Sequence, residues 1–125
     1  MKHIITFDVG TTSVKTCLFN QDLQRLAERT DEYELITPEE NIVESDPAIY
    51  INASKSGISW VLKAAGVAPE SVAAFSVTSQ GETLIPVDES GKPIRNSIVW
   101  LDSRAEEQAA QINAKISSDE LYART

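Results

Sequence analysis

The chain has little cysteine or histidine and no long apolar run. Its 125 residues include one cysteine, Cys17, and one histidine, His3, so a disulfide framework or a cysteine–histidine metal cluster cannot form within it. No apolar run approaches the roughly 20 residues of a transmembrane helix, and the first residues lead into a strand pattern without a signal segment. We therefore expect a cytoplasmic protein with no membrane partner.

Positive charge is scarce as well. Eleven Lys and Arg residues face 19 Asp and Glu residues, which gives a net charge of −8. Proteins that bind nucleic acid gain affinity from clustered Lys and Arg, so we expect no nucleic-acid partner and a local site for any anionic ligand. The 42% apolar content is enough for one core, and no linker or repeat divides the chain.

The first third of the chain predicts an antiparallel strand meander. Residues 4–7 form a short apolar run, and residues 13–19 alternate well enough to be its hairpin partner. Residues 23–33 can return as a third strand, whose polarity places it at a sheet edge.

A long helix should follow. Asp46 is a suitable N-cap, Pro47 suits the first helical position and Gly66 ends the pattern. Gly57 lowers helix propensity in mid-helix, so we expect it to allow close packing on the sheet. The predicted apolar face consists of Ile49, Ala53, Gly57, Trp60, Val61 and Ala64.

The second half predicts more strands and helices. Residues 72–77 form a continuous apolar run that suits a central strand covered on both faces. Short strands at 83–87 and 98–100 should flank a turn at 88–93. A helix should start at Asp102 or Ser103, and its apolar stripe should consist of Ala105, Ala109, Ile112 and Ile116. Residues 117–125 should start another helix. The sum is an α/β fold with a mixed sheet, and the tight hairpins exclude the doubly wound dinucleotide fold.

The polar hairpin turn in "DVGTTSVK", residues 8–15, is a candidate phosphate site. Gly10 would take positive φ and approach a ligand, and successive amides and hydroxyls would donate to phosphate oxygens. Asp8 would hold a hydrated Mg²⁺, and Lys15 would add positive charge. The alternative is an ordinary hairpin; the stretch is not a Walker loop, because it lacks G-K-[ST] and no helix follows the glycine.

Segments spread over the whole chain resemble the FGGY-type carbohydrate kinases, whose superfamily includes actin, hexokinase and the heat-shock chaperone ATPases. "FDVGTTSVK" resembles the first phosphate-binding hairpin, and "IVESDP" resembles the segment that caps the first long helix. "AAFSVTSQGETLIPVDESGKPIRNSIVWLDSRA" is similar to the sugar-site strand, hairpin and W-x-D-x-R stretch. The resemblance implies a ribonuclease-H-like fold of the actin-like ATPase type.

It also implies roles for individual residues, with ATP and Mg²⁺ as cofactors and a small sugar or polyol as substrate. Asp8 would be the magnesium-associated carboxylate. The residues around the ATP phosphates would be Gly10, Thr11, Thr12, Ser13 and Lys15, and those at the substrate would be Gln80, Gly81, Glu82 and Trp100.

The chemistry of these side chains suits a polyol. A Glu82 carboxylate can accept from two hydroxyls, the Gln80 amide can donate and accept, and Trp100 offers a flat apolar wall. The alternatives are a turn at Gln80, a solvated Glu82 and a core tryptophan. Asp102 and Arg104 should brace the start of the helix, with Asp102 as N-cap.

Two remaining candidates for chemistry have simpler explanations. His3 is expected to be an exposed residue of the strand, and Cys17 to be a packing residue.

One position departs from the family pattern. Glycerol kinases have a basic residue where this chain has Gly81, so a bulkier sugar or sugar alcohol could occupy the space. Xylulose kinases carry Met and His at this strand end, which this chain also lacks.

The resemblance also implies missing parts. The family's catalytic base, an aspartate, lies well downstream, so residues 1–125 would be a partial N-terminal lobe without catalytic residues or the C-terminal ATP lobe. We expect the isolated chain to be inactive and to expose apolar surface, with a homodimer as one outcome. The alternatives are a non-catalytic nucleotide-binding module or an inert fragment of the same superfamily.

Overall fold

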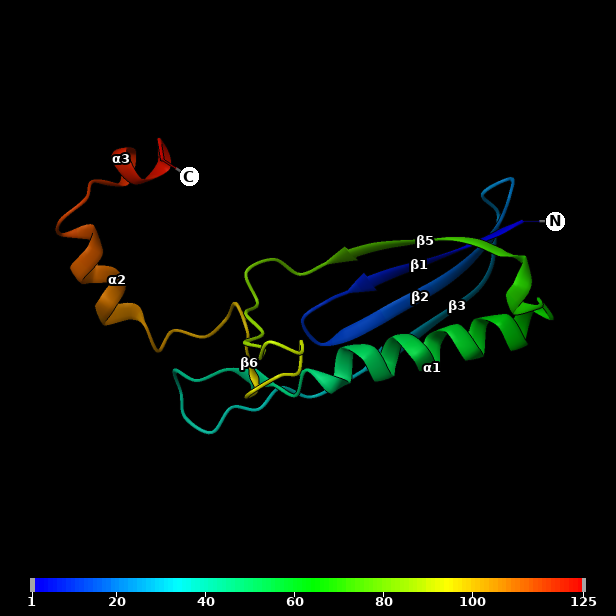
Figure 1. Cartoon of the computed structure of the whole chain (residues 1–125), viewed down its shortest axis with the longest axis horizontal. Coiled ribbons are helices and arrows are strands. Elements are labelled where there is room, and N and C mark those ends of the chain that lie inside the picture. The colour runs from blue at the N-terminus through cyan, green and yellow to red at the C-terminus, as the bar shows by residue number, and fades with distance from the viewer. Residues whose placement is uncertain (1, 125) are drawn as a thin grey trace.

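A four-stranded mixed sheet forms the body of the protein (Figure 1). The computed structural model describes residues 2–124. Strands β1 (His3–Val9), β2 (Ser13–Asn20) and β3 (Arg25–Glu32) form an antiparallel meander, and β5 (Val72–Ser79) pairs in parallel with β1. The order is β3-β2-β1-β5, which confirms the predicted meander, its polar edge strand and the mixed sheet.

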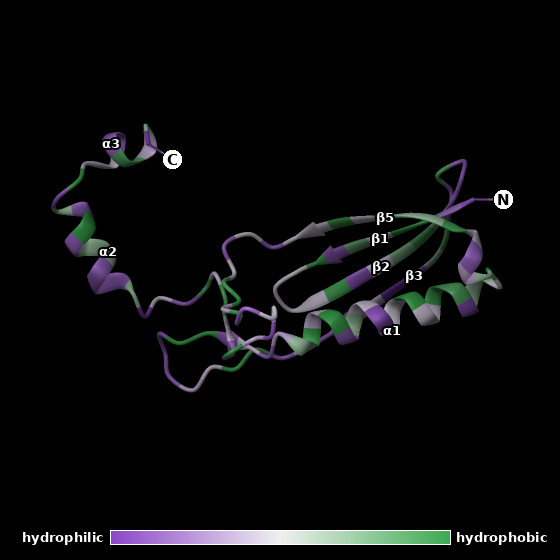
Figure 2. Cartoon of the chain, in the orientation of Figure 1, coloured by the Kyte–Doolittle hydropathy of each residue, from purple (hydrophilic) through white to green (hydrophobic). Residues whose placement is uncertain are grey.

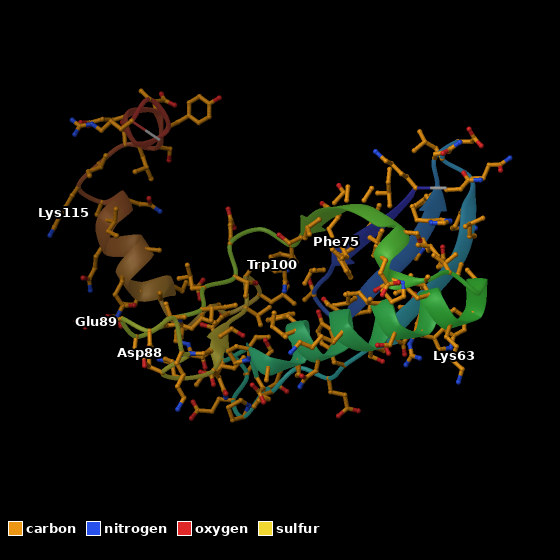
Figure 3. The ribbon with its side chains drawn as sticks, turned by 45° about the vertical axis from the view of Figure 1, so that its right-hand side comes forward. Lys63, Phe75, Asp88, Glu89, Trp100 and Lys115 are labelled. Carbon is orange, nitrogen blue, oxygen red and sulfur yellow. The ribbon has the colours of Figure 1, made fainter. Side chains whose placement is uncertain are left out.

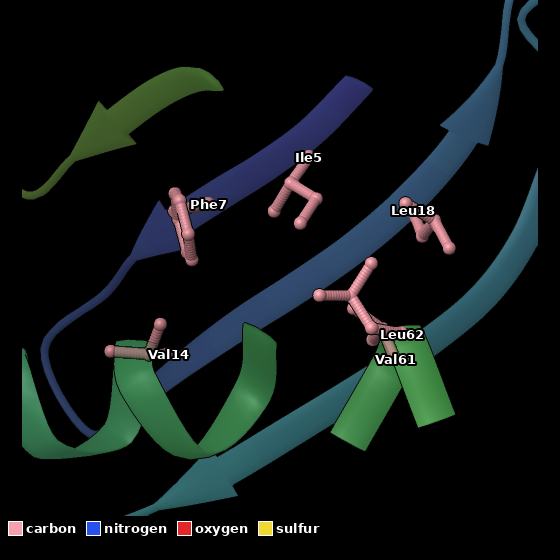
Figure 4. Close-up of a cluster of buried hydrophobic side chains, with 6 residues drawn as sticks. All are labelled: Ile5, Phe7, Val14, Leu18, Val61 and Leu62. Atoms are coloured by element: carbon pink, nitrogen blue, oxygen red, sulfur yellow. The ribbon is translucent and has the colours of Figure 1, made fainter. Parts of the chain in front are cut away.

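Helix α1 (Ala48–Ala65) covers one face of this sheet and lies mainly over β2 and β3 (Figure 1). Alternation along β1 and β2 turns every second side chain toward the helix. Figure 2 shows the hydrophobic residues of β1 and β2 beside a mostly hydrophilic β3. The buried cluster, shown in Figure 4, consists of Ile5, Phe7, Val14, Leu18, Val61 and Leu62.

Both predicted helix ends are confirmed. The Asp46 carboxylate accepts a 2.9 Å hydrogen bond from the amide of Ala48, and Pro47 already has helical backbone angles. At the other end Gly66 has φ of 64°, and its amide donates to the Lys63 carbonyl. A residue without Cβ takes this left-handed conformation at little cost.

The predicted apolar face of the helix was wrong in part. Trp60 is 43% exposed and Ala64 is exposed, whereas Tyr50 and Leu62 are buried. The indole of Trp60 lies on the outside against the Arg29 guanidinium, which is 6.0 Å from the ring centroid, a favourable cation–π geometry.

Gly57 is where α1 comes closest to the sheet, as predicted. A Cβ placed on Gly57 would lie 2.1 Å from Thr16 Oγ1 and 2.7 Å from Thr16 Cβ. Thr16 is fully buried on β2. The absence of a side chain at Gly57 therefore sets the distance between the helix and the sheet.

Gly57→Ala should destabilise the chain, although alanine is the better helix former. The added methyl group has to push α1 from Thr16, and overpacking of this kind costs about 1–3 kcal/mol. Urea unfolding should show a lower midpoint for Gly57→Ala and an unchanged or higher one for Ser59→Ala, which is exposed on the same helix. Equal midpoints for Gly57→Ala and the parent would contradict the packing argument.

Strand β5 was predicted to be central and covered on both faces, and this was wrong for the described residues. It is the second edge of the sheet, and nearly all of its residues are exposed. Phe75 and Val77 are 60% and 64% exposed, because α1 lies over β2 and β3 and leaves β5 uncovered.

A smaller sheet lies beside the ends of β1 and β5. Strands β4 (Glu44–Ser45) and β6 (Ser97–Ile98) pair antiparallel, and isolated bridges join Leu84 to Ile98 and Val87 to Pro93. The predicted turn at 88–93 is confirmed, since the Asp88 side chain accepts from the amides of Ser90 and Lys92. The predicted strand at 83–87 was wrong, because only isolated bridges at Leu84 and Val87 form there. The predicted strand at 98–100 is confirmed only at Ile98, the last residue of β6.

The C-terminal helices extend away from the sheet (Figure 1). Helix α2 (Glu106–Asn113) begins a turn later than predicted, and its expected apolar stripe is mostly exposed. Helix α3 (Ser118–Tyr122) confirms the prediction that another helix starts within residues 117–125. Within residues 2–124, no helix is both long and apolar enough to cross a membrane.

The expectation for His3 was wrong. It is 7% exposed, and its Nδ1 lies 2.9 Å from the Ser71 hydroxyl, which belongs to the short 3₁₀ turn η1 (Pro69–Ser71) before β5. The imidazole therefore ties the start of β1 to the connection that leads into β5.

Candidate functional site

The turn between β1 and β2 is held by hydrogen bonds of its own. The Gly10 amide donates to the Ser13 carbonyl at 2.9 Å, and the Tyr33 hydroxyl donates to the Gly10 carbonyl at 2.6 Å. Gly10 does not take positive φ, which corrects that expectation. Its amide closes the turn, so the hydroxyls of Thr11, Thr12 and Ser13 remain the better phosphate donors.

Tyr33 supports the candidate site, although no pattern in the sequence predicted this role. It follows the polar strand β3, and the register of that strand brings it back to the hairpin turn, where its amide also donates to the Thr12 carbonyl. Burial, followed by the neighbouring Tyr50, raises the pKa of Tyr33 to about 12. The phenol therefore stays protonated at neutral pH and remains a donor to the turn.

Asp8 lies on the sheet face opposite α1. The register places it between Lys15 on β2 and Thr78 on β5, and the three line a hollow of about 160 Å³. Lys15 also pairs with Glu28 on β3 at 3.6 Å, so part of its charge is neutralised. A single exposed carboxylate beside a lysine suits a hydrated cation shared with phosphates better than an enclosed metal site. Within residues 2–124, no three His, Cys, Asp or Glu side chains gather in a metal-binding group.

Cys17 reaches the same hollow from β2 and is buried, as expected of a packing residue. Burial, followed by the nearby Glu28 carboxylate, raises the pKa of the thiol. The protonated thiol is a weak nucleophile, which agrees with a packing role.

The four predicted substrate residues meet at one corner. Gln80, Gly81, Glu82 and Trp100 line a hollow of about 420 Å³ together with Thr11 of the hairpin turn. Trp100 lies between the sheet and the C-terminal helices (Figure 3), and its indole Nε1 donates to Thr11 Oγ1 at 2.9 Å. The structure thus joins the phosphate-site candidate and the substrate-site candidate directly.

This corner continues the pairing of β1 with β5. The backbone amide of Gln80 donates to the backbone carbonyl of Val9 at 2.8 Å, which extends the pairing of β5 with β1 by one residue. Asp8 precedes Val9, so its carboxylate lies one strand position from the corner, on the opposite sheet face from Val9.

The backbone at the corner is unusual at Glu82. Its φ is 60°, a conformation that few residues other than glycine adopt, and such strain is concentrated at functional sites. Gly81 shows the opposite: its φ is not positive, and a Cβ there would meet nothing within 4 Å. Neither space nor backbone conformation requires glycine at this position, so its effect is to leave the hollow open.

A network of charges fastens the segment after Trp100. The Asp102 carboxylate accepts from the Val43 amide at 2.7 Å and from Arg104 Nε and Nη2 at 2.8 and 2.6 Å. Glu44 accepts from the same Arg104, and also from Arg95 and Asn96. The Arg104 guanidinium holds the pKa of Asp102 far below its usual range, and Asp102 and Glu44 in turn raise the pKa of Arg104.

The predicted bracing by Asp102 and Arg104 is therefore confirmed. The N-cap assignment was wrong, because Ala105 precedes α2 and Asp102 instead bonds back toward β4.

Asp102→Asn should destabilise the protein at pH 7 by about 1–3 kcal/mol, because the Arg104 guanidinium loses one of its two charged acceptors. The folded-state pKa of Asp102 is lowered, so its stabilisation is present above the ordinary value of about 4 and is lost as the pH falls below it. Urea unfolding at pH 7 and at pH 3 should show the difference between parent and variant shrinking in acid. A constant difference, or an equal effect of Asp22→Asn at an exposed turn, would contradict this.

The fold and the corner together define the class of protein to which the chain belongs. An antiparallel meander, a long helix and a strand parallel to the first, with a polar hairpin turn beside a hollow, make an α/β lobe of the ribonuclease-H-like, actin-like ATPase type. The model of the N-terminal domain of the FGGY family of carbohydrate kinases matches residues 3–125, and the chain belongs to this family.

Known relatives agree. A glycerol kinase from Thermoanaerobacter is 39% identical over 101 residues, which are 79% of this chain and 20% of that protein. The gluconate kinase structure from Lactobacillus acidophilus matches with a TM-score of 0.84 and 28% identity over 91% of this chain and 23% of that one. Plasmodium falciparum glycerol kinase with ADP matches with a TM-score of 0.81 and 26% identity over 95% of this chain and 24% of that one. The chain thus spans a fifth to a quarter of these relatives' length.

Proposed function

We propose that residues 1–125 are a partial N-terminal lobe of a cytoplasmic, ATP-dependent kinase that phosphorylates a hydroxyl of a small sugar or polyol. The observation that carries this proposal is the 2.9 Å hydrogen bond from Trp100 to Thr11, which puts the polar hairpin turn and the polyol-suited corner around one hollow. A kinase needs this juxtaposition, because the hydroxyl must lie in line with the γ-phosphate.

In this proposal the hairpin turn binds the ATP phosphates. The hydroxyls of Thr11, Thr12 and Ser13 donate to phosphate oxygens, with Gly10 closing the turn and Lys15 adding positive charge beside them. The Asp8 carboxylate is the residue that would hold Mg²⁺, and it fits because Mg²⁺ commonly takes one or two carboxylates together with phosphates and waters. When bound, the ion supplies positive charge for the developing negative charge of the transferred group.

The substrate binds at the corner. Glu82 accepts from its hydroxyls, Gln80 orients it, Trp100 packs against its C–H groups, and Gly81 leaves room. Because the chain lacks the basic side chain expected of glycerol kinases at this position, we propose a substrate larger than glycerol. A neutral polyol also suits this corner, because the charged residue among those that line its hollow is the negative Glu82.

The base that takes the hydroxyl proton is proposed to lie in the part of the relatives beyond this chain. Asp102 does not suit the task, because Arg104 and the Val43 amide engage its carboxylate and a strongly lowered pKa makes it a weak proton acceptor. The isolated chain is thus expected to be inactive. The second candidate is a non-catalytic nucleotide-binding module, which has no need of the Gln80 to Trp100 corner.

The full-length protein that contains this chain should phosphorylate at least one pentulose, hexulose, tetritol or pentitol with MgATP. Asp8→Ala should lower kcat by at least about a hundredfold with little change in sugar KM, because it removes charge neutralisation in the transition state. Glu82→Gln should mainly raise sugar KM by about tenfold, the effect of one charge-assisted hydrogen bond.

A coupled assay for ADP release measures both effects, with Ser59→Ala as a surface control. Nucleotide binding without any sugar turnover would favour the non-catalytic module. Equal loss of stability in both variants, with no kinetic effect, would contradict the proposed roles of Asp8 and Glu82 in the site.

We also propose that the 125-residue chain forms a homodimer through β5. The outer strand β3 is protected against pairing by Arg25, Glu28, Arg29, Asp31 and Glu32, whereas β5, VAAFSVTS, has no charge and no proline. An antiparallel pairing of two β5 strands keeps Phe75 and Val77 of both copies on the same face, beside an uncovered apolar hollow of about 440 Å³.

Sedimentation of the 125-residue chain should therefore show a concentration-dependent dimer. Val77→Lys should give a monomer, because a charge on this face opposes the pairing, and Thr30→Lys on the protected edge should leave the dimer intact. A parent chain that remains monomeric at all concentrations would overturn the proposal.

A further inference from the structure

A chain of hydrogen bonds leads from the proposed substrate corner into the protein interior. Gln80 Nε2 lies 3.2 Å from the Tyr50 hydroxyl, which lies 2.7 Å from Ser45 Oγ. Ser45 Oγ lies 2.6 Å from Ser97 Oγ, and Ser97 Oγ lies 2.8 Å from the Ser45 carbonyl oxygen. Tyr50, Ser45 and Ser97 are all buried, and the chain connects the end of β5 with α1, β4 and β6.

The interior end of this chain determines its direction. A carbonyl oxygen only accepts, so the single proton of the Ser97 hydroxyl is committed to the Ser45 carbonyl. Ser97 Oγ must then accept from Ser45 Oγ, and Ser45 Oγ must accept from Tyr50. The phenolic proton is thus used, and Tyr50 can only accept from Gln80.

This direction decides which way the Gln80 amide faces. The group next to Tyr50 has to be the NH₂ end, so the carbonyl oxygen Oε1 points elsewhere. Oε1 is buried and has no hydrogen-bond partner among the described residues, although buried amide oxygens are normally paired. Gln80 itself lines both the corner hollow with Trp100 and an adjoining hollow of about 210 Å³ with Tyr50 and Thr83.

We propose that Tyr50, held by Ser45 and Ser97, is a positioning residue that makes Gln80 an acceptor toward the substrate. This inference rests on the proposed function and deepens it: the substrate group at Gln80 is a hydroxyl that donates its proton. An ether oxygen, a carbonyl or a fluorine at the same place cannot pair with Oε1. The device therefore selects substrates by hydroxyl pattern, at a point separate from the Glu82 carboxylate.

Tyr50→Phe in the full-length kinase is the direct test. It removes the hydroxyl and keeps the ring, which packs edge-on against Tyr33 with centroids 5.7 Å apart. Sugar KM should rise by about tenfold, the usual effect of one misplaced hydrogen bond, while kcat and the KM for ATP change less than about twofold.

Substrate analogues supply a readout that a merely structural role would not move. Among analogues in which each hydroxyl in turn is replaced by fluorine, one should bind the parent enzyme about tenfold less well because it cannot donate to Oε1. This discrimination should disappear in Tyr50→Phe, where the amide is free to turn. Ser97→Ala, three hydrogen bonds from Gln80, should weaken the discrimination as well, and Ser59→Ala should keep it.

Two outcomes would overturn the proposal. One is parent-like discrimination against the fluorinated analogue in Tyr50→Phe. The other is a parallel rise in the KM values for sugar and ATP with a falling Tm, which would mean that Tyr50 acts through folding.

Failure of the proposed function is distinguishable, because it would appear as a parent enzyme that phosphorylates no polyol. In that case the orientation of Gln80 can be measured without turnover. NMR of the ¹⁵N-labelled 125-residue chain should show contacts between the Gln80 side-chain NH₂ and the Tyr50 ring, and their absence would overturn the inferred orientation.

Discussion

The close approach of α1 to the sheet at Gly57 and Thr16 is the constraint on which the rest of the structure depends. A helix that touches β2 at this distance can bury Val61 and Leu62 against the side chains of β1 and β2. It also fixes the position of the first turn of α1, where Tyr50 lies. A small shift of the helix would move the Tyr50 hydroxyl out of hydrogen-bond range of Gln80, so the packing in the core and the geometry of the corner are parts of one arrangement.

The candidate site is assembled where several chain segments end. The β1–β2 turn contributes Thr11, the segment after β5 contributes Gln80 and Glu82, and the segment after β6 contributes Trp100. Each segment is irregular, and each is held by polar contacts to a buried or half-buried side chain. Tyr33 holds the turn, Tyr50 holds Gln80, and Asp102 holds the segment after Trp100. Loops held in this way can present side chains to a ligand with little loss of conformational entropy on binding.

The two edges of the sheet have opposite character. The charged β3 ends the sheet on one side, and the uncharged β5 leaves apolar side chains and backbone groups available on the other. The chain also covers only a fifth to a quarter of its relatives' length. One face of β5 is uncovered because α1 lies over β2 and β3. An apolar run whose pattern predicts a central strand is therefore exposed.

The sequence by itself determined most of the longer elements and the residue types of the candidate site. Alternation predicted the meander, Asp46 and Gly66 predicted the helix ends, and the order of motifs identified the family, because these signals are local or nearly so. Only the tertiary structure decided which surfaces meet: the burial of His3, the outward position of Trp60, the contact of Tyr33 with Gly10, and the chain of hydrogen bonds behind Gln80. Those contacts join residues up to 68 positions apart, and their partners depend on strand register and helix rotation, which no local pattern specifies.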